Sequence, residues 1–281
     1  MNLLDGPARL RWAVGALSLS VALGACSDPP MLGLPPRPAS APGATALFES
    51  VAEMPLEERE DVFVREVLRG NVPDGLRRWQ PVRLSGMVDG RRVEATIWVL
   101  PDYVAVGSNQ DHALVPLTPA SAMEIGDSVG AVLPTPTMVD AVWDQAAIRL
   151  GPDSIPPSPA MTTVPVFWDH DRLVRARRQS RGVDIGPLTA GHKKDVVLST
   201  RLADRPGRVV IYGWHRPSGD PIQPEYAGHT DDWVDYSHGI RLVHRTARID
   251  GSPIDLMDAL ADPDFATIFS AQGPIRVVYQ E

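Results

Sequence analysis

The sequence predicts an α+β fold, with a mainly antiparallel sheet and helices packed on it, in a single domain that follows a Pro-rich tether. Some stretches repeat apolar residues at helical spacing, whereas others alternate them or form short apolar runs typical of strands. Their order is helix, meander, helices and then strands, which lacks regular β-α-β alternation. The 28 prolines indicate long ordered loops rather than a helical bundle.

The first part of the chain predicts one helix and a meander of strands. Residues 47–70 carry glutamates near the start and arginines near the end, which suits a helix dipole, and they contain an apolar stripe. Residues 82–107 have the alternation and the β-branched content of strands, and Asp89-Gly90 is a strong hairpin signal. We expect three antiparallel strands there and a fourth over residues 113–117.

Three helices are expected in the middle of the chain. Residues 118–129 and 135–150 each begin with a Thr-Pro pair, and proline suits the first turn of a helix. Residues 166–181 predict the third helix. Arginines gather toward its end, where they suit the helix dipole, and we interpret them as a solvated face rather than a binding patch.

The last part of the chain predicts strands around a short helix. Residues 196–199 and 209–214 are nearly continuous apolar runs, which are typical of buried central strands. Residues 239–249 predict another strand, residues 254–261 a helix and residues 275–279 a closing strand.

The N-terminus predicts a targeting segment. A short basic region precedes residues 12–25, an apolar run that is too short to span a bilayer. The run ends in Leu23-Gly24-Ala25-Cys26, which resembles the lipobox of bacterial lipoproteins. This resemblance implies cleavage before Cys26 and acylation of that cysteine. An ordinary secretory peptide is the alternative.

These features divide the chain into a signal peptide (1–25), a tether (26–43) and an α+β domain (44–281). The proline-rich tether cannot bury a core and favours extended backbone. Lipid on Cys26 would make a membrane the first partner, because buried acyl chains hold a protein on a bilayer. Ser27 after the cysteine favours the outer membrane if the cell is Gram-negative. The expected location is therefore the bacterial cell envelope.

Charge and cysteine content exclude several classes of function. The formal net charge of −8 gives no electrostatic footprint for DNA or RNA, so no nucleic-acid partner is expected. Cys26 is the only cysteine, which excludes an intramolecular disulfide. If Cys26 is lipidated, a cysteine nucleophile is excluded as well.

The candidate functional residues gather in residues 191–239. Four of the seven histidines lie there among carboxylates and aromatic residues, and so do the only two lysines, Lys193 and Lys194. Since lysine shifts its pKa on burial and arginine does not, this pair suggests a need for an amine; a chance pair on a solvated loop is the alternative. The polar clusters fall at predicted strand ends, where scaffolds often hold function. The stretch is also similar to secreted bacterial proteins, a similarity that brings no family name or activity.

Three kinds of chemistry fit this stretch. The first is a divalent metal site, for example zinc, held by His229, Asp235 and His238, because imidazole and carboxylate are suitable ligands. The second is metal-free acid–base catalysis, with histidine as base, aspartate as orienter and lysine as electrostatic partner. The residues expected to line such a catalytic site are His192, Lys194, Asp195, His215, Asp235 and His238.

The third kind is binding without chemistry. Trp214, Tyr226, Trp233 and Tyr236 flank the polar groups, and aromatic platforms beside carboxylates commonly recognise sugars. From the three together we expect a hydrolase of an envelope or extracellular polymer. The alternative is a non-catalytic envelope lipoprotein that binds a glycan or a protein partner.

Overall fold

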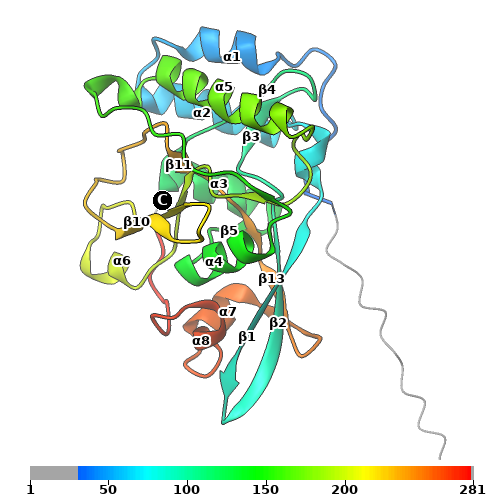
Figure 1. The fold of residues 1–281 in the computed structure, drawn as a ribbon, viewed down its shortest axis with the longest axis vertical. Helices are drawn as coiled ribbons and strands as arrows, with labels where there is room; N and C mark the ends of the chain where they lie inside the picture. Colours follow the sequence, from blue (N-terminus) through cyan, green and yellow to red (C-terminus); the bar gives the residue numbers. More distant parts are fainter. Residues whose placement is uncertain (1–30, 280–281) are drawn as a thin grey trace, which may run out of the picture.

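The computed structural model describes residues 31–279 and has the predicted α+β class (Figure 1). The predicted signal peptide, Cys26 and Ser27 lie outside the described residues. The predicted tether is described from residue 31, and this part lies against the domain instead of extending from it. Leu32 is buried, and Arg37 Nε donates a hydrogen bond to Asn71 Oδ1 at 2.8 Å.

Two helices occupy the stretch where one was predicted. α1 (Ala44–Val51) and α2 (Leu56–Leu68) are separate, and Pro55 immediately precedes α2. The prediction of a single helix over residues 47–70 was therefore wrong. The physical reason is that the residue before a proline is driven out of helical conformation, so the chain breaks at Met54.

A six-stranded sheet forms one side of the domain. Its central strand is β2 (Arg91–Val99), which pairs with β1 (Gln80–Val88) in the predicted hairpin. Asp89 and Gly90 take positive φ values of 50° and 74°, as a two-residue hairpin turn requires. The remaining strands are β5 (Ala131–Val132), β12 (Val243–His244), β13 (Thr246–Ile249) and β14 (Ser252–Asp255).

The predicted meander ends after its second strand. β3 (Ala105–Gly107) pairs with β4 (His112–Leu114) in a separate two-stranded sheet. It does not pair with β2, because β12 and β13 occupy the free edge of β2 and Leu100 N already donates to Leu242 O at 2.9 Å.

The helices after both Thr-Pro pairs form as predicted. α3 (Pro119–Val129) and α4 (Pro136–Gln145) each start after a threonine whose hydroxyl accepts a backbone N–H. α4 stops at Gln145, short of residue 150, because Ile148–Arg149 forms β6 and pairs with β7 (Thr189–Ala190). The remaining helical elements are η1 (Asp74–Arg77), η2 (Pro159–Thr162), α5 (Val164–Ser180), α6 (Arg201–Asp204), α7 (Leu256–Ala261) and α8 (Ala266–Phe269).

A smaller four-stranded sheet positions the candidate site. Its order is β10 (Pro221–Tyr226), β9 (Ile211–His215), β8 (Lys194–Val196) and β11 (His238–Gly239). β11 runs parallel to β8, whereas β9 runs antiparallel to it. α4 contacts both β1 and β9 and so joins the two sheets.

Two strand predictions near the C-terminus were wrong. Residues 239–249 are not one strand, because the chain leaves the small sheet after β11 and then enters the large sheet as β12 and β13. Residues 275–279 form no strand; Ile275 N bonds to Leu260 O instead. Across residues 31–279, no helix combines the length and apolar character needed to cross a membrane.

Candidate functional site

The pairing of β8 with β11 decides which predicted site residues meet. Lys194 lies beside His238, and Asp195 lies beside Gly239. Because side chains alternate along a strand, Lys194 and Asp195 leave opposite faces of the sheet. The predicted residues therefore separate into an outer group with Lys194 and an inner group with Asp195.

Four predicted residues form the outer group, which we name the Lys194 cluster: Lys194, His229, Asp235 and His238. The carboxylate of Asp235 is its fixed point. Asp235 Oδ1 accepts hydrogen bonds from Ser237 N at 2.7 Å and Ser237 Oγ at 2.5 Å. Asp235 Oδ2 accepts one from Trp233 Nε1 at 3.4 Å and lies 3.8 Å from His238 Nε2. These contacts aim the carboxylate at the imidazole of His238.

The imidazole of His238 is buried with both ring nitrogens free of hydrogen bonds to any residue in 31–279. Burial lowers the pKa of His238 to about 4, although Asp235 acts to raise it. The ring is therefore neutral at pH 7 and has a nitrogen that can accept a proton. A buried polar atom without a partner costs free energy, so such an atom indicates a place for a ligand or water.

Lys194 and Trp214 form the next part of the cluster. The ammonium of Lys194 lies 5.0 Å from the centroid of the Trp214 ring, and burial lowers the pKa of Lys194. Trp214 has a φ of 56°, a conformation that costs a non-glycine residue free energy and is often found at functional sites. Its indole Nε1 is also buried without a hydrogen-bond partner within the described chain.

His229 closes the cluster on the solvent side. Its ring stacks on Trp233 with centroids 4.8 Å apart, and the ring of Tyr226 meets it edge-on at 5.2 Å. Burial lowers the pKa of His229; Asp235 acts to raise it, and Lys194 and Arg208 act to lower it further. His229 therefore lies close enough to Lys194 and Asp235 for their charges to change its pKa.

The inner group is a buried charge network around His192 and Asp195. His192 Nε2 lies 3.1 Å from Asp102 Oδ1, and Arg178 forms an ion pair with the same carboxylate. Asp195 Oδ2 accepts a hydrogen bond from Tyr103 Oη at 2.8 Å, and its Oδ1 lies 3.6 Å from Arg241 Nε. The side chains of this network are buried, so its geometry fits a structural role.

The pKa shifts of the inner group follow from burial and pairing. Burial acts to raise the pKa of Asp102, but Arg178 and His192 outweigh it and hold that pKa below its usual range. Burial raises the pKa of Asp195 to about 6 and lowers that of His192 to about 4.

Lys193 lies between the two groups. Its Nζ is 3.1 Å from His170 Nδ1 and donates to Tyr236 O at 2.5 Å. Burial lowers the pKa of Lys193 to about 8, opposed by carboxylates that include Asp171 and Asp235. Lys193 thus ties α5 to the turn that carries Asp235 and His238.

His215 joins neither group through a hydrogen bond or ion pair within residues 31–279, although its charge acts on Asp195 of the inner group. Its Nε2 lies 2.9 Å from Asp140 Oδ1, and its ring stacks on Trp143 at a centroid distance of 5.1 Å. The residue belongs to the contact between β9 and α4. His215 therefore stands apart from Lys194, Asp235 and His238.

The sequence argument missed the partners of the inner group. The arginines of α5 were interpreted as a solvated face, but Arg178 is buried against Asp102. The interpretation was wrong for Arg178 because the carboxylate of Asp102 provides a buried partner for its guanidinium group. A signal did exist: Phe167, Val174 and Arg178 follow helical spacing on one face.

The geometry does not favour Ser199 or Ser237 as a nucleophile, and it does not gather a set of metal ligands within residues 31–279. Ser237 donates to Asp235, and Ser199 Oγ bonds to Glu225 and Gln272, so neither has a histidine partner within the described chain. Within residues 31–279, no group of three or more His, Cys, Asp and Glu side chains is arranged to hold a metal ion. The proposed metal ligands His229, Asp235 and His238 stay a prediction.

Comparisons with protein-family models, with curated proteins and with solved structures give no match to this chain.

Proposed function

We propose that the protein is a lipid-anchored component of the bacterial envelope that hydrolyses an envelope or extracellular polymer at the Lys194 cluster. The supporting observation is the convergence of Lys194, Asp235 and His238, with both nitrogens of His238 buried and unpartnered within residues 31–279. Lipid attachment at Cys26 rests on the lipobox resemblance. The envelope location follows from that attachment.

In the proposed reaction His238 is the general base. Its neutral imidazole takes a proton from water, and the water oxygen adds to a carbonyl carbon of the polymer. Asp235 stabilises the resulting imidazolium. The Lys194 ammonium stabilises the negative charge that develops on the carbonyl oxygen. The imidazolium then returns its proton to the departing amine or alcohol as the carbon–nitrogen or carbon–oxygen bond breaks.

Substrate access requires a movement in this proposal. His238 is 1% exposed, whereas Lys194 and His229 are half-buried. The segment that carries His229 and Trp233 would open to admit the polymer and would close over it, holding the reacting water and excluding bulk solvent. Closure of loops over a reacting group is a common step in enzymes.

The test is polymer hydrolysis by His238→Asn beside His244→Asn. His244 is a matched control because it lies in the large sheet, edge-on to Trp79 at 5.3 Å. Full-length protein would be incubated with isolated envelope polymer, and soluble fragments would be measured by mass spectrometry. We expect release by the wild type and by His244→Asn, and a loss of roughly 100-fold or more in His238→Asn. Equal release by all three proteins would refute the proposed role.

A second function, glycan binding without hydrolysis, is favoured by one observation. The rings of Tyr226, His229 and Trp233 are in contact one after another, with Tyr226 edge-on to His229 and His229 stacked on Trp233, and Tyr226 is 43% exposed. An exposed aromatic ring can face the apolar side of a sugar. Trp233→Ala would then abolish glycan binding measured by calorimetry, while wild type and His238→Asn would bind equally well and release no fragments.

A further inference from the structure

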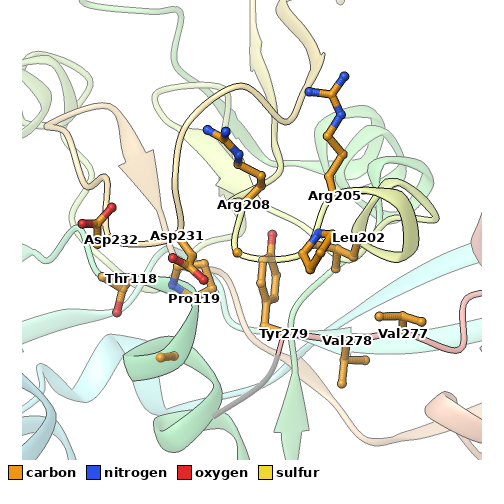
Figure 2. A pocket seen from close by; sticks show the side chains of 13 residues that line it. Thr118, Pro119, Leu202, Arg205, Arg208, Asp231, Asp232, Val277, Val278 and Tyr279 are labelled. Carbon is orange, nitrogen blue, oxygen red and sulfur yellow. The ribbon is translucent and has the colours of Figure 1, made fainter.

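A cavity of about 500 Å³ lies next to the Lys194 cluster and belongs to none of the roles above. Figure 2 shows its walls, which come from the start of α3, the loop after α6, the segment before Trp233 and the C-terminal segment. This volume falls within the range of small-molecule sites. Apolar side chains, among them Leu202, Val277 and Val278, supply part of the lining.

The cavity presents both signs of charge. Arg205 and Arg208 lie on one side, and Asp231 and Asp232 lie on the other (Figure 2). Within residues 31–279, no ion pair joins these guanidinium groups to these carboxylates; Arg208 donates instead to Gly228 O at 3.0 Å. Two cations and two anions therefore stay available to a ligand in the same cavity.

The start of α3 is not itself an anion site here. Thr118 N and Thr118 Oγ1 both donate to the carboxylate of Glu60. The helix end is already satisfied by this side chain. Recognition of an anion in the cavity would therefore depend on Arg205 and Arg208.

The cavity and the Lys194 cluster share the segment from His229 to Asp235. Val209 N donates to His229 O at 3.2 Å, which fixes the loop after α6 against this segment. The charge of Arg208 acts on His229, and so do the charges of Lys194 and Asp235. A polymer bound in the cavity could therefore extend from Arg208 to the Lys194 cluster.

We propose that this cavity is a substrate subsite for a peptide that carries both a carboxylate and an amine. The inference rests on the proposed hydrolase function and names the part of the polymer that the site recognises. Carboxylates of the peptide would pair with Arg205 and Arg208, and its amine with Asp231 and Asp232. A polyanion is disfavoured by the two aspartates, and a neutral glycan would make no use of the four charges.

The test uses the tripeptide Ala-Glu-Lys as the probe and full-length protein in calorimetry. We expect tripeptide binding to weaken about tenfold or more in the double variants Arg205→Gln/Arg208→Gln and Asp231→Asn/Asp232→Asn. Each double variant removes the protein charges that would pair with one kind of charged group on the peptide. Arg216→Gln is the matched control, since Arg216 is an exposed arginine in the turn between β9 and β10. The uncharged peptide N-acetyl-Ala-Gln-norleucine-NH₂ should bind at least tenfold more weakly than the probe.

The outcomes separate the subsite from the hydrolase proposal. His238→Asn should bind the tripeptide as the wild type does, since it leaves the cavity intact. Tripeptide binding without any polymer hydrolysis by the wild type would support the subsite and refute the hydrolase. The subsite alone would be refuted if polymer hydrolysis is lost in His238→Asn but the wild type does not bind the tripeptide, or if both double variants bind it as tightly as the wild type does.

Discussion

Lys193 and Lys194 are neighbours in the chain, yet their ammonium groups lie in different environments. Lys193 Nζ is buried 3.1 Å from His170 Nδ1, whereas Lys194 Nζ lies 5.0 Å from the Trp214 ring centroid on the half-buried side. Only Lys194 belongs to the proposed site. The pair therefore provides two nearly identical substitutions with different expected effects.

Lys193→Met should destabilise the fold, and Lys194→Met should impair hydrolysis. Loss of the Lys193 ammonium leaves the buried His170 Nδ1 and Tyr236 O without their hydrogen-bond partner, at a cost of about 1–3 kcal/mol in the free energy of unfolding. Loss of Lys194 removes a partly exposed cation–π contact, worth about 1 kcal/mol. Urea unfolding and fragment release measure the two effects. An unaltered rate of release in Lys194→Met would contradict the role of its ammonium.

Stability should fall as the pH is lowered from 6.5 toward 4. The pKa values of His192 and His238 are lowered to about 4 and that of His170 is lowered further, so these rings take up protons only on unfolding in this range. Asp195, with its pKa raised to about 6, releases one proton on unfolding and opposes them. Unfolding near pH 5 therefore takes up roughly two protons in total. This uptake predicts that the free energy of unfolding falls by about 2–3 kcal/mol for each pH unit of acidification.

Urea unfolding at pH 5 and pH 6 measures this slope. His238→Asn should reduce it by roughly one proton, because one buried imidazole no longer titrates. A slope that is unchanged in that variant would show that His238 is accessible to protons in the folded state.

Metal analysis distinguishes the acid–base mechanism from a metal centre. The acid–base mechanism predicts that chelators leave fragment release unchanged, since His238 itself activates water. Elemental analysis of full-length protein that was never exposed to chelator should be compared with His229→Ala. Near-stoichiometric zinc that disappears in His229→Ala would overturn the acid–base mechanism and would make His229, Asp235 and His238 a metal centre.

Gly191 should be far less tolerant of alanine than Gly182. Both have positive φ, 96° and 67°, so alanine is strained at either position at a cost of about 1 kcal/mol. A Cβ at Gly191 would also lie 2.3 Å from Leu150 O and from the Trp143 ring, whereas none of the described atoms lies within 4 Å of a Cβ at Gly182. We expect Gly191→Ala to unfold at a clearly lower temperature than Gly182→Ala. Equal melting temperatures would contradict the packing argument.

Local signals in the sequence predicted the local elements well. Thr118 and Thr135 precede helices, and Asp89-Gly90 forms a hairpin turn, because the information for caps and turns lies in adjacent residues. The division of residues 47–70 into two helices was not predicted, although proline suits the first turn of a helix and Pro55 immediately precedes α2.

The arrangement of the site was predictable only in part. The window of residues 191–239 contains all four members of the Lys194 cluster, but no pattern within it indicates that β11 lies beside β8. Partners from distant segments, such as Asp102 and Arg241, carry no local signal of their contact with His192 and Asp195. Their pairing is set by tertiary packing, which one sequence does not display.

The parallel contact between Lys194 and His238 also has a consequence for folding kinetics. It closes a long loop of chain that contains β9 and β10, and such a closure is costly in entropy until neighbouring elements are in place. Non-local pairings of this kind are expected to form late and slowly. Lys194 and the segment that carries Asp235 and His238 would therefore come together only when most of the domain has folded. A partly folded chain would not contain the assembled Lys194 cluster.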